Sequence, residues 1–226
     1  MKRTKEPEVM DLPEEAAAYA QADFSAVNQA FVESLLVHAG RREYASALDL
    51  GTGPADIPIR LAAARALWRI TAVDASAAML DLARANVARA AMGDRIVLLQ
   101  ADAKNIPLPA GSFDVIFSNS ILHHIGNVAP FWAQVKRLAA DGATVFLRDL
   151  ARPDSPRAAR DLVDRYAASE TKLLQEEYYR SLLAAFTVEE VQRQLRKAGL
   201  ALKVRMASDR HLDVFGTVDR CRDGTT

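Results

Sequence analysis

The stretch Ala47-Leu48-Asp49-Leu50-Gly51-Thr52-Gly53-Pro54-Ala55-Asp56 decides the fold of this chain. A short apolar run breaks here at two glycines, and a helical pattern follows to Leu67. This order predicts a strand, a tight turn and a helix. The turn needs glycine because its backbone bends sharply and lies against a ligand without a Cβ in the way. The start of the helix presents unpaired backbone N–H groups to whatever binds there.

Glycine turns of this kind have two common interpretations. One is the Gly-x-Gly-x-x-Gly turn of dinucleotide-binding folds, whose helix N-terminus holds a pyrophosphate. Its third glycine would fall at Asp56, whose carboxylate would repel that pyrophosphate. The other is the Asp/Glu-x-Gly-x-Gly-x-Gly turn of the class I S-adenosylmethionine-dependent methyltransferases, which this stretch resembles at Asp49, Gly51 and Gly53. Ala55 stands where the last glycine usually lies. We favour this second interpretation because that cofactor carries an amino-acid moiety and no phosphate.

The composition excludes several other classes of protein. The 226 residues suffice for one sizeable domain, and 29 basic residues balance 29 acidic ones, so we expect no nucleic acid partner. A single cysteine, Cys221, excludes a disulfide framework and a cysteine zinc cluster. No apolar run reaches membrane-spanning length, and the charged segment 1–9 lacks a signal-peptide core. We therefore expect a cytoplasmic protein without a membrane partner. The sequence does not distinguish a monomer from a homodimer.

Strand and helix patterns alternate along the chain. Strands are expected at 45–50, 68–74, 95–100, 113–117, 143–150, 200–206 and 211–218. The last two are joined by only four residues, which forces an antiparallel hairpin. The helix before this hairpin begins with a capping box of Thr187 and Glu190.

Two acids at predicted strand ends extend the resemblance. Asp74 ends the second strand, where a carboxylate accepts hydrogen bonds from ribose hydroxyls in both interpretations. Ser76 is available as the cap of the next helix, which leaves Asp74 for the ligand. Ala101-Asp102-Ala103 resembles the segment with which these methyltransferases bind adenine, through the acid and the following backbone N–H. The resemblance implies a cofactor-binding set of Asp49, Gly51, Gly53, Ala55, Asp74, Ala75, Met79, Asp102, Ala103 and Asn119.

The fourth strand leads into a second family-like stretch. Residues 107–125, PLPAGSFDVIFSNSILHHI, resemble small-molecule methyltransferases, including the quinone C-methyltransferase type. Nucleic-acid and protein amide methyltransferases carry Asn/Asp-Pro-Pro-Tyr/Phe at this strand end, and that motif is absent here. The resemblance therefore implies a small-molecule acceptor.

His123 and His124 are the first of the candidate bases. Neighbouring residues of a turn point in different directions, so we expect no metal site at these histidines. Asp149 follows Arg148 at the end of the fifth strand, where the two residues either pair with each other or face a ligand. The candidate general bases are His123, His124, Asp149 and Tyr178.

Two helical segments are candidates for covering the site. Residues 1–40 are predicted to form an N-terminal lid, with residues 1–12 polar and loose and helices near 14–22 and 28–38. Residues 151–186 contain no strand pattern and are predicted to form a substrate cap. Their aromatic and cationic residues either shape a pocket or form the cap's own buried face and solvated edge. The candidate substrate-binding residues are Tyr19, Phe24, Arg152, Tyr179 and Arg180.

Together these features predict a single α/β domain over 1–226, with the cofactor-binding core at 41–150 and the last helix and hairpin at 187–218. The family resemblance implies a seven-stranded Rossmann-like sheet of order 3-2-1-4-5-7-6, with strand 7 antiparallel and helices on both faces. It also implies S-adenosyl-L-methionine as cofactor and in-line methyl transfer, with S-adenosyl-L-homocysteine as product. The alternatives are a non-catalytic S-adenosylmethionine-binding protein, an RNA or protein methyltransferase, and a nicotinamide oxidoreductase.

Overall fold

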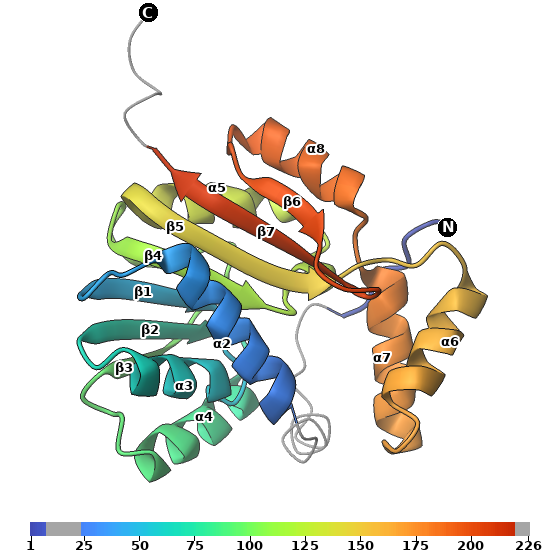
Figure 1. Ribbon diagram of the computed structural model, residues 1–226, viewed down its shortest axis with the longest axis horizontal. Helices are drawn as coiled ribbons and strands as arrows, with labels where there is room; N and C mark the ends of the chain where they lie inside the picture. The colour runs from blue at the N-terminus through green and yellow to red at the C-terminus, as the bar shows by residue number, and fades with distance from the viewer. Residues whose placement is uncertain (8–23, 220–226) are drawn as a thin grey trace, which may run out of the picture.

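The computed structural model describes residues 1–7 and 24–219 of the chain. A seven-stranded sheet of order β3-β2-β1-β4-β5-β7-β6 runs through its centre (Figure 1). Its strands are β1 (Ala45–Leu50), β2 (Trp68–Asp74), β3 (Ile96–Gln100), β4 (Phe113–Asn119), β5 (Ala139–Leu150), β6 (Lys203–Met206) and β7 (His211–Val218). The neighbours among β1 to β5 pair in parallel, whereas β7 is antiparallel to β5 and to β6. The predicted fold class is confirmed.

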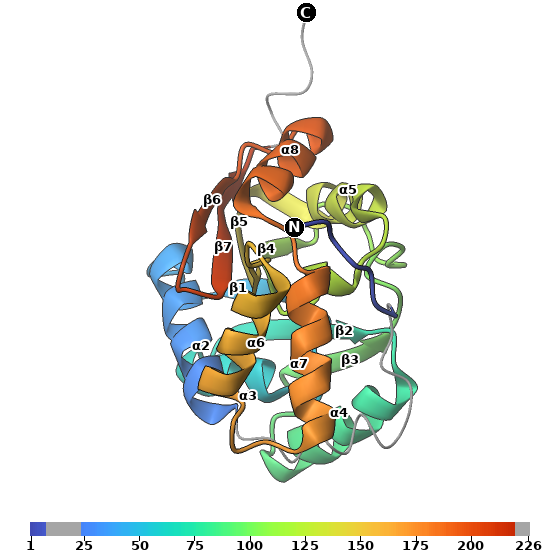
Figure 2. The same ribbon diagram turned by 90° about the vertical axis from the view of Figure 1, so that its right-hand side faces the viewer.

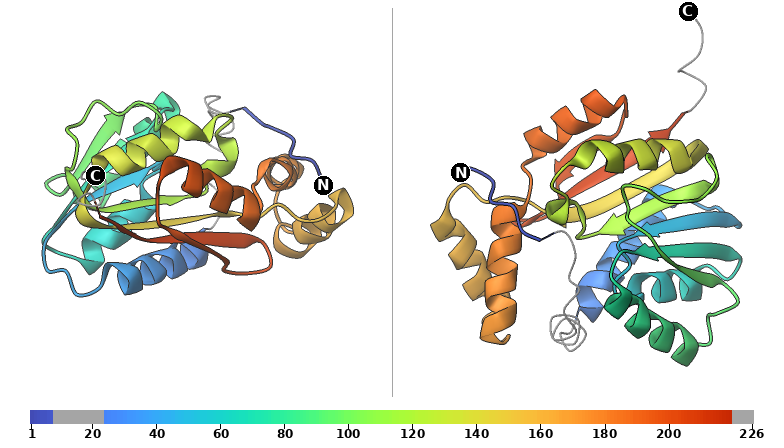
Figure 3. Two further views of the ribbon diagram at one scale, coloured as in Figure 1. Left: turned by 90° about the horizontal axis from the view of Figure 1, so that it is seen from above. Right: turned by 180° about the vertical axis from the view of Figure 1, so that it is seen from behind.

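Helices cover both faces of this sheet, as the view from above shows (Figure 3). The described α-helices are α2 (Ser25–Ala39), α3 (Asp56–Ala64), α4 (Ala77–Arg89), α5 (Val128–Leu138), α6 (Pro156–Tyr166), α7 (Lys172–Ala184) and α8 (Val188–Ala198). Helices α2, α3 and α4 pack on one face and α5 and α8 on the other. Helices α6 and α7 lie beyond the carboxyl ends of the strands (Figures 1 and 2). Among the described residues, no helix has the length and apolar character needed to cross a bilayer.

The burial of both sheet faces explains why four of the six residues of β1 are apolar. Leu48 and Leu50 pack in the layer that contains α5 and α8, whereas Ala45 and Ala47 pack in the layer that contains α2 and α3. Successive side chains of a strand point to opposite faces. A strand between two helical layers therefore needs apolar residues at nearly every position.

Several local predictions are confirmed. The Oγ of Ser76 accepts a hydrogen bond from the backbone N–H of Met79 at 3.2 Å and caps α4. At the start of α8, Thr187 and Glu190 form both hydrogen bonds of the predicted capping box. The helix expected near 28–38 is α2, and residues 154–186 contain the two helices α6 and α7.

Two segments differ from the prediction. Strand β5 begins at Ala139 rather than at 143, because Ala139 already pairs with Phe113 before a shift in register. Residues 1–7, expected to be loose, instead pack on the cap: the backbone N–H of Thr4 donates to Leu183 O at 3.0 Å, and the Arg3 guanidinium lies 3.8 Å from the centre of the Phe186 ring. The helix expected near 14–22 lies outside the described residues.

An ion pair joins the two longest strands near the carboxyl end of β5 and the start of β7. Arg148 of β5 stands opposite Asp213 of β7 and donates two hydrogen bonds to its carboxylate, at 2.7 and 2.9 Å. Asp213 is 1% exposed. The pairing of Arg148 with Asp149 considered from the sequence is wrong, because adjacent strand residues point to opposite faces.

Replacing Arg148 should destabilise the fold strongly. We expect Arg148→Met to lower the free energy of unfolding by about 3–5 kcal/mol, because it leaves the Asp213 carboxylate buried without its main partner. Urea denaturation measures this change. The matched double variant Arg148→Met/Asp213→Leu removes both charges and should recover most of the loss. A double variant no more stable than the single one would contradict this assignment.

Candidate active site

The turn between β1 and α3 has the left-handed backbone that its glycines predict. The φ angles are +76° at Gly51, +54° at Gly53 and +64° at Ala55. A Cβ on Gly51 would lie 2.7 Å from Cδ1 of Ile121, so Ile121 packs directly against the turn. A Cβ on Gly53 would meet no atom within 4 Å, so the turn faces open space there. Ala55 adopts a conformation that costs a non-glycine residue about 1–2 kcal/mol.

Asp74 holds the turn from the end of β2. Its Oδ2 accepts the backbone N–H of Gly53 at 2.8 Å, and its Oδ1 accepts the backbone N–H of Ser76 at 2.9 Å. Burial raises the pKa of Asp74, and these backbone hydrogen bonds oppose that rise. A carboxylate has about four lone-pair sites, and the backbone N–H of Ala75 also donates to Asp74, so about one site remains for a ligand hydroxyl.

The other predicted cofactor residues lie around the same edge of the sheet. Asp49 is 2% exposed, and burial raises its pKa to about 8. Ala75 is exposed next to Asp74, whereas Met79 is buried at the start of α4. Asn119 is the last residue of β4 and is half-buried. The parallel register brings these strand ends to one edge of the sheet.

The segment after β3 forms a tight turn. Oδ1 of Asp102 accepts the backbone N–H of Lys104 at 2.8 Å, and its Oδ2 lies 3.3 Å from the ammonium of Lys104. The side chain of Ala103 is buried in the core. The Asp102 side chain stays half exposed, at 51%. Asp102 therefore presents its carboxylate at the edge of the sheet, and Ala103 anchors the loop in the core.

A buried histidine–aspartate pair lies next to the glycine turn. The short 3₁₀ helix η1 (Leu122–His124) follows Ile121 and places Nδ1 of His123 2.6 Å from Oδ1 of Asp149. Asp149 also accepts the backbone N–H groups of Leu122, at 2.6 Å, and of Leu150, at 2.7 Å. Because a carboxylate only accepts, Nδ1 of His123 carries the proton and Nε2 keeps a lone pair.

His123 and Asp149 each stabilise the charged form of the other. Burial lowers the pKa of His123, but the charge and hydrogen bond of Asp149, together with Glu6, outweigh it and raise the pKa above its ordinary value of 6.5. Burial likewise opposes the ionisation of Asp149, yet His123 and the backbone donors hold the pKa of Asp149 below its ordinary value. Asp149 is therefore placed to stabilise the positive charge that His123 takes up when its Nε2 accepts a proton.

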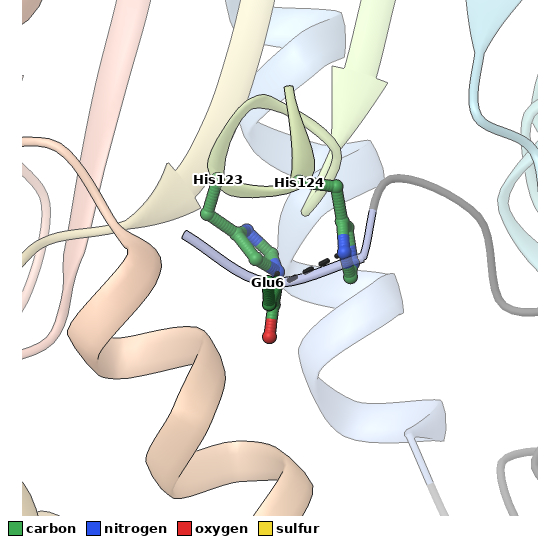
Figure 4. Close-up of side chains that lie close together, drawn as sticks. All are labelled: Glu6, His123 and His124. Carbon is green, nitrogen blue, oxygen red and sulfur yellow. Dashed lines mark ion pairs between the residues drawn. The ribbon is translucent and has the colours of Figure 1, made fainter. Parts of the chain in front are cut away.

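Glu6 completes the site from the other end of the sequence. Its Oε1 lies 3.6 Å from Nε2 of His123 and 3.1 Å from Nδ1 of His124, as Figure 4 shows. The two imidazole rings are close neighbours, with centroids 4.2 Å apart. The expectation that these histidines point in different directions is wrong, because the tight 3₁₀ turn brings both rings to the N-terminal segment. Burial, followed by the charge of His123, lowers the pKa of His124 to about 3.

The cap residues mostly contact the cap itself. Burial raises the pKa of Tyr178 to about 12. The Arg160 guanidinium lies 3.4 Å from the centre of the Tyr179 ring. Arg180 pairs with glutamates of its own helix. Arg152 is buried, where it donates to Ala185 O at 3.1 Å and pairs with Glu190 at 2.7 Å.

Two predicted substrate residues belong to the N-terminal part of the chain. Phe24 stands immediately before α2 and is half-buried. Tyr19 lies outside the described residues. Sequence reasoning missed Glu6, since no local pattern connects a glutamate near the N-terminus with a histidine pair more than a hundred residues away.

The sheet order and the glycine turn define the class: an α/β fold of the methyltransferase type. Residues 48–147 match the family model described as a methyltransferase domain. In fold, the chain is similar to a crystallised SAM-dependent methyltransferase from Aquifex aeolicus, with a TM-score of 0.71 and 19% identity over 92% of this chain and 98% of that one. Residues 48–147 therefore match a methyltransferase domain, as the sequence motifs predicted, and the fold is that of the class I S-adenosylmethionine-dependent methyltransferases.

The matches to curated relatives cover a smaller share of each protein. The chain is 29% identical to 27-O-demethylrifamycin SV methyltransferase of Amycolatopsis mediterranei, over 68% of this chain and 53% of that protein. It is 33% identical to demethylmenaquinone methyltransferase of Roseiflexus castenholzii, over 49% of this chain and 44% of that protein. The chain thus spans about half the length of the curated relatives it matches.

The two glycines should differ in their tolerance of a methyl group. Gly53→Ala should cost about 1–2 kcal/mol of stability for the left-handed backbone alone. Gly51→Ala should cost about 1–3 kcal/mol more, because Ile121 must also move. Urea denaturation measures both costs, and a double-mutant cycle with Ile121→Ala isolates the contact. Equal costs for the two single variants would rule out this steric assignment.

Proposed function

We propose that this chain transfers the methyl group of S-adenosyl-L-methionine to a hydroxyl group of a small molecule, releasing S-adenosyl-L-homocysteine. The observation that carries this proposal is the His123–Asp149 pair, which Ile121 connects directly to the glycine turn. Attack by a hydroxyl oxygen needs a base, and a carboxylate-oriented imidazole is the usual one. The relative that acts on 27-O-demethylrifamycin SV supports a small-molecule acceptor.

The glycine turn fits the cofactor. The open space at Gly53 admits a ligand close to the backbone, and the Asp74 carboxylate keeps a lone-pair site for a ribose hydroxyl. Asp102 and the backbone N–H of Ala103, which follow the end of the neighbouring strand β3, would bind the adenine. When bound, the cofactor supplies an activated sulfonium methyl group. The remaining residues of the proposed cofactor set are Asp49, Gly51, Ala55, Ala75, Met79 and Asn119.

The chain's own contribution is alignment, proton transfer and enclosure. The acceptor oxygen gives its proton to Nε2 of His123 while the new O–C bond forms and the C–S bond breaks. Asp149 keeps the proton on Nδ1 and stabilises the imidazolium that results. The α6–α7 cap beyond the strand ends would exclude water from this step (Figure 2).

His123 is the best of the four candidate bases. A base needs a pKa close to the working pH. The pKa of His124 is lowered to about 3, which makes it a weak base, and the pKa of Tyr178 is raised to about 12, which keeps it a neutral phenol. Asp149 already accepts three hydrogen bonds, so its role is to orient His123.

The enclosing segments extend the proposal. In this proposal the N-terminal part, residues 1–40, acts as a lid and residues 151–186 act as a cap. The described candidates for contacting the acceptor are Phe24, Arg152, Tyr179 and Arg180, and the further candidate Tyr19 lies outside the described residues. Of these, Arg152 acts through the ion pair that anchors the cap to α8. Glu6 lies over Nε2 of His123 in this structure, so segment 1–7 must shift to admit the acceptor.

Removal of Asp74 should weaken cofactor binding. Calorimetric titration should give heat with S-adenosylmethionine and with S-adenosylhomocysteine. In Asp74→Ala we expect affinity to fall by roughly 10–100-fold, the loss of a hydrogen bond to a charged group. Asp81→Ala, an exposed carboxylate on the next helix, is the control and should bind normally. Heat with NAD but with neither sulfur compound would refute the proposed cofactor.

The pH dependence of methyl transfer should report His123. The base acts in its neutral form, so the rate should fall as the pH drops through the raised pKa of His123, above 6.5. Asp149→Asn removes the carboxylate that raises this pKa, so the fall should move to lower pH and the rate should drop by roughly 100-fold or more. The assay follows labelled methyl transfer to the acceptor found by screening metabolite extracts.

The control for this profile is His38→Gln, since His38 lies on α2 against Phe146 and Phe215. It should keep the profile of the unaltered protein. An Asp149→Asn profile that coincides with the normal one would contradict the role of His123. Cofactor binding without transfer to any acceptor would favour a non-catalytic binding protein.

A further inference from the structure

Three metal-ligating side chains converge below η1 (Figure 4). The carboxylate of Glu6 and the imidazoles of His123 and His124 each offer one ligand atom, and these atoms lie within 4.8 Å of one another. Their side chains are largely buried, with exposed fractions of 7%, 4% and 18%. Glu6 comes from the N-terminal segment 1–7, and both histidines come from η1.

The spacing of the ligand atoms suits one small ion. Zinc binds imidazole nitrogen and carboxylate oxygen at about 2.0–2.2 Å, so two ligands of a tetrahedral ion lie about 3.4 Å apart. The Oε1 of Glu6 is 3.1 Å from Nδ1 of His124 and 3.6 Å from Nε2 of His123. These two separations fall on either side of the tetrahedral value.

The lone pair of His123 also points to a cation. Nδ1 of His123 donates to Asp149, so Nε2 presents its lone pair to the carboxylate of Glu6. At 3.6 Å this contact is too long for a hydrogen bond. In protein metal sites, a ligand histidine commonly donates its other ring N–H to a carboxylate. Asp149 supplies that arrangement here.

The carboxylate ligand is held in place by its surroundings. The hydroxyl of Ser181 donates to the Glu6 carboxylate at 3.3 Å. Arg3, three residues earlier, donates to His123 O at 2.7 Å and to Ile125 O at 3.1 Å. The N-terminal segment is therefore attached both to η1 and to the cap helix α7, which positions the carboxylate against the histidines.

We propose that Glu6, His123 and His124 form a binding site for one divalent transition-metal ion. Two imidazoles and one carboxylate suit zinc, cobalt, nickel or iron(II) and not magnesium or calcium, which take oxygen ligands. Three protein ligands leave one coordination position open to water or another small ligand. This site departs from the expectation of no metal, which rested on the histidines pointing apart.

Occupancy of this site has a consequence for the reaction, and this consequence alone rests on the proposed function. An ion bound to Nε2 of His123 uses the lone pair that would accept the acceptor's proton. Metal binding and base catalysis at His123 therefore exclude each other. The same ion would hold segment 1–7 over the site through Glu6, so a metal-loaded protein is closed and a metal-free protein is competent for transfer.

Cobalt titration tests the site without any acceptor or cofactor. The purified full chain, stripped with EDTA, should bind one equivalent of Co²⁺ with the visible absorption bands of a four- or five-coordinate ion, and Zn²⁺ should displace it. Glu6→Gln and His124→Phe should each weaken binding by more than the roughly 10–100-fold that loss of an outer-shell partner costs. Ser181→Ala, which removes such an outer partner, should fall within that range.

Two controls separate this site from others on the chain. Glu43→Gln changes an exposed glutamate and should bind cobalt normally. Cys221→Ser removes the chain's one thiol and should also bind normally. Absence of a bound equivalent, unchanged affinity in Glu6→Gln, or loss of binding in Cys221→Ser would each overturn the proposal. Because none of these measurements uses methyl transfer, their failure would leave the proposed function standing.

Discussion

The carboxylate of Asp149 is the interaction on which the site depends. It is 3% exposed and accepts hydrogen bonds from the backbone N–H groups of Leu122 and Leu150 and from the ring of His123. A buried charge is tolerated only when it is fully hydrogen-bonded. These bonds attach η1 to the end of β5 and orient the imidazole. Leu122 and Ile125, both buried in the core, hold the same turn by apolar contacts.

The sheet supplies the second constraint. Because β1 to β5 run parallel, their carboxyl ends meet at one edge, and the glycine turn, Asp74, Asp102 and the histidine turn all lie there. Ile121 packs against Gly51 and so joins the cofactor side of the site to the histidines. A glycine at position 51 therefore serves two purposes: it permits the left-handed backbone, and it leaves room for the residue that precedes η1.

The helical cap and the N-terminal segment are attached to this edge by contacts of a different kind. The cap has a small apolar core of its own, and Arg152 and Arg3 link it to its surroundings through carbonyl groups and a glutamate. Such polar links are weaker determinants of position than a shared apolar core. This difference supports the proposed role of the cap in admitting and releasing ligands.

The sequence by itself determined the strands, the glycine turn, the hairpin and the helix caps, because each depends on local signals such as glycine spacing, apolar runs and capping residues. The sheet order and the cofactor edge were implied by the resemblance to the class I methyltransferases. Tertiary structure alone decided the partners of the charged groups. Arg148 faces Asp213 instead of its neighbour Asp149, and Glu6 reaches the histidines across more than a hundred residues. The physical reason is that side-chain pairing depends on distances through space, which periodicity along a chain does not encode.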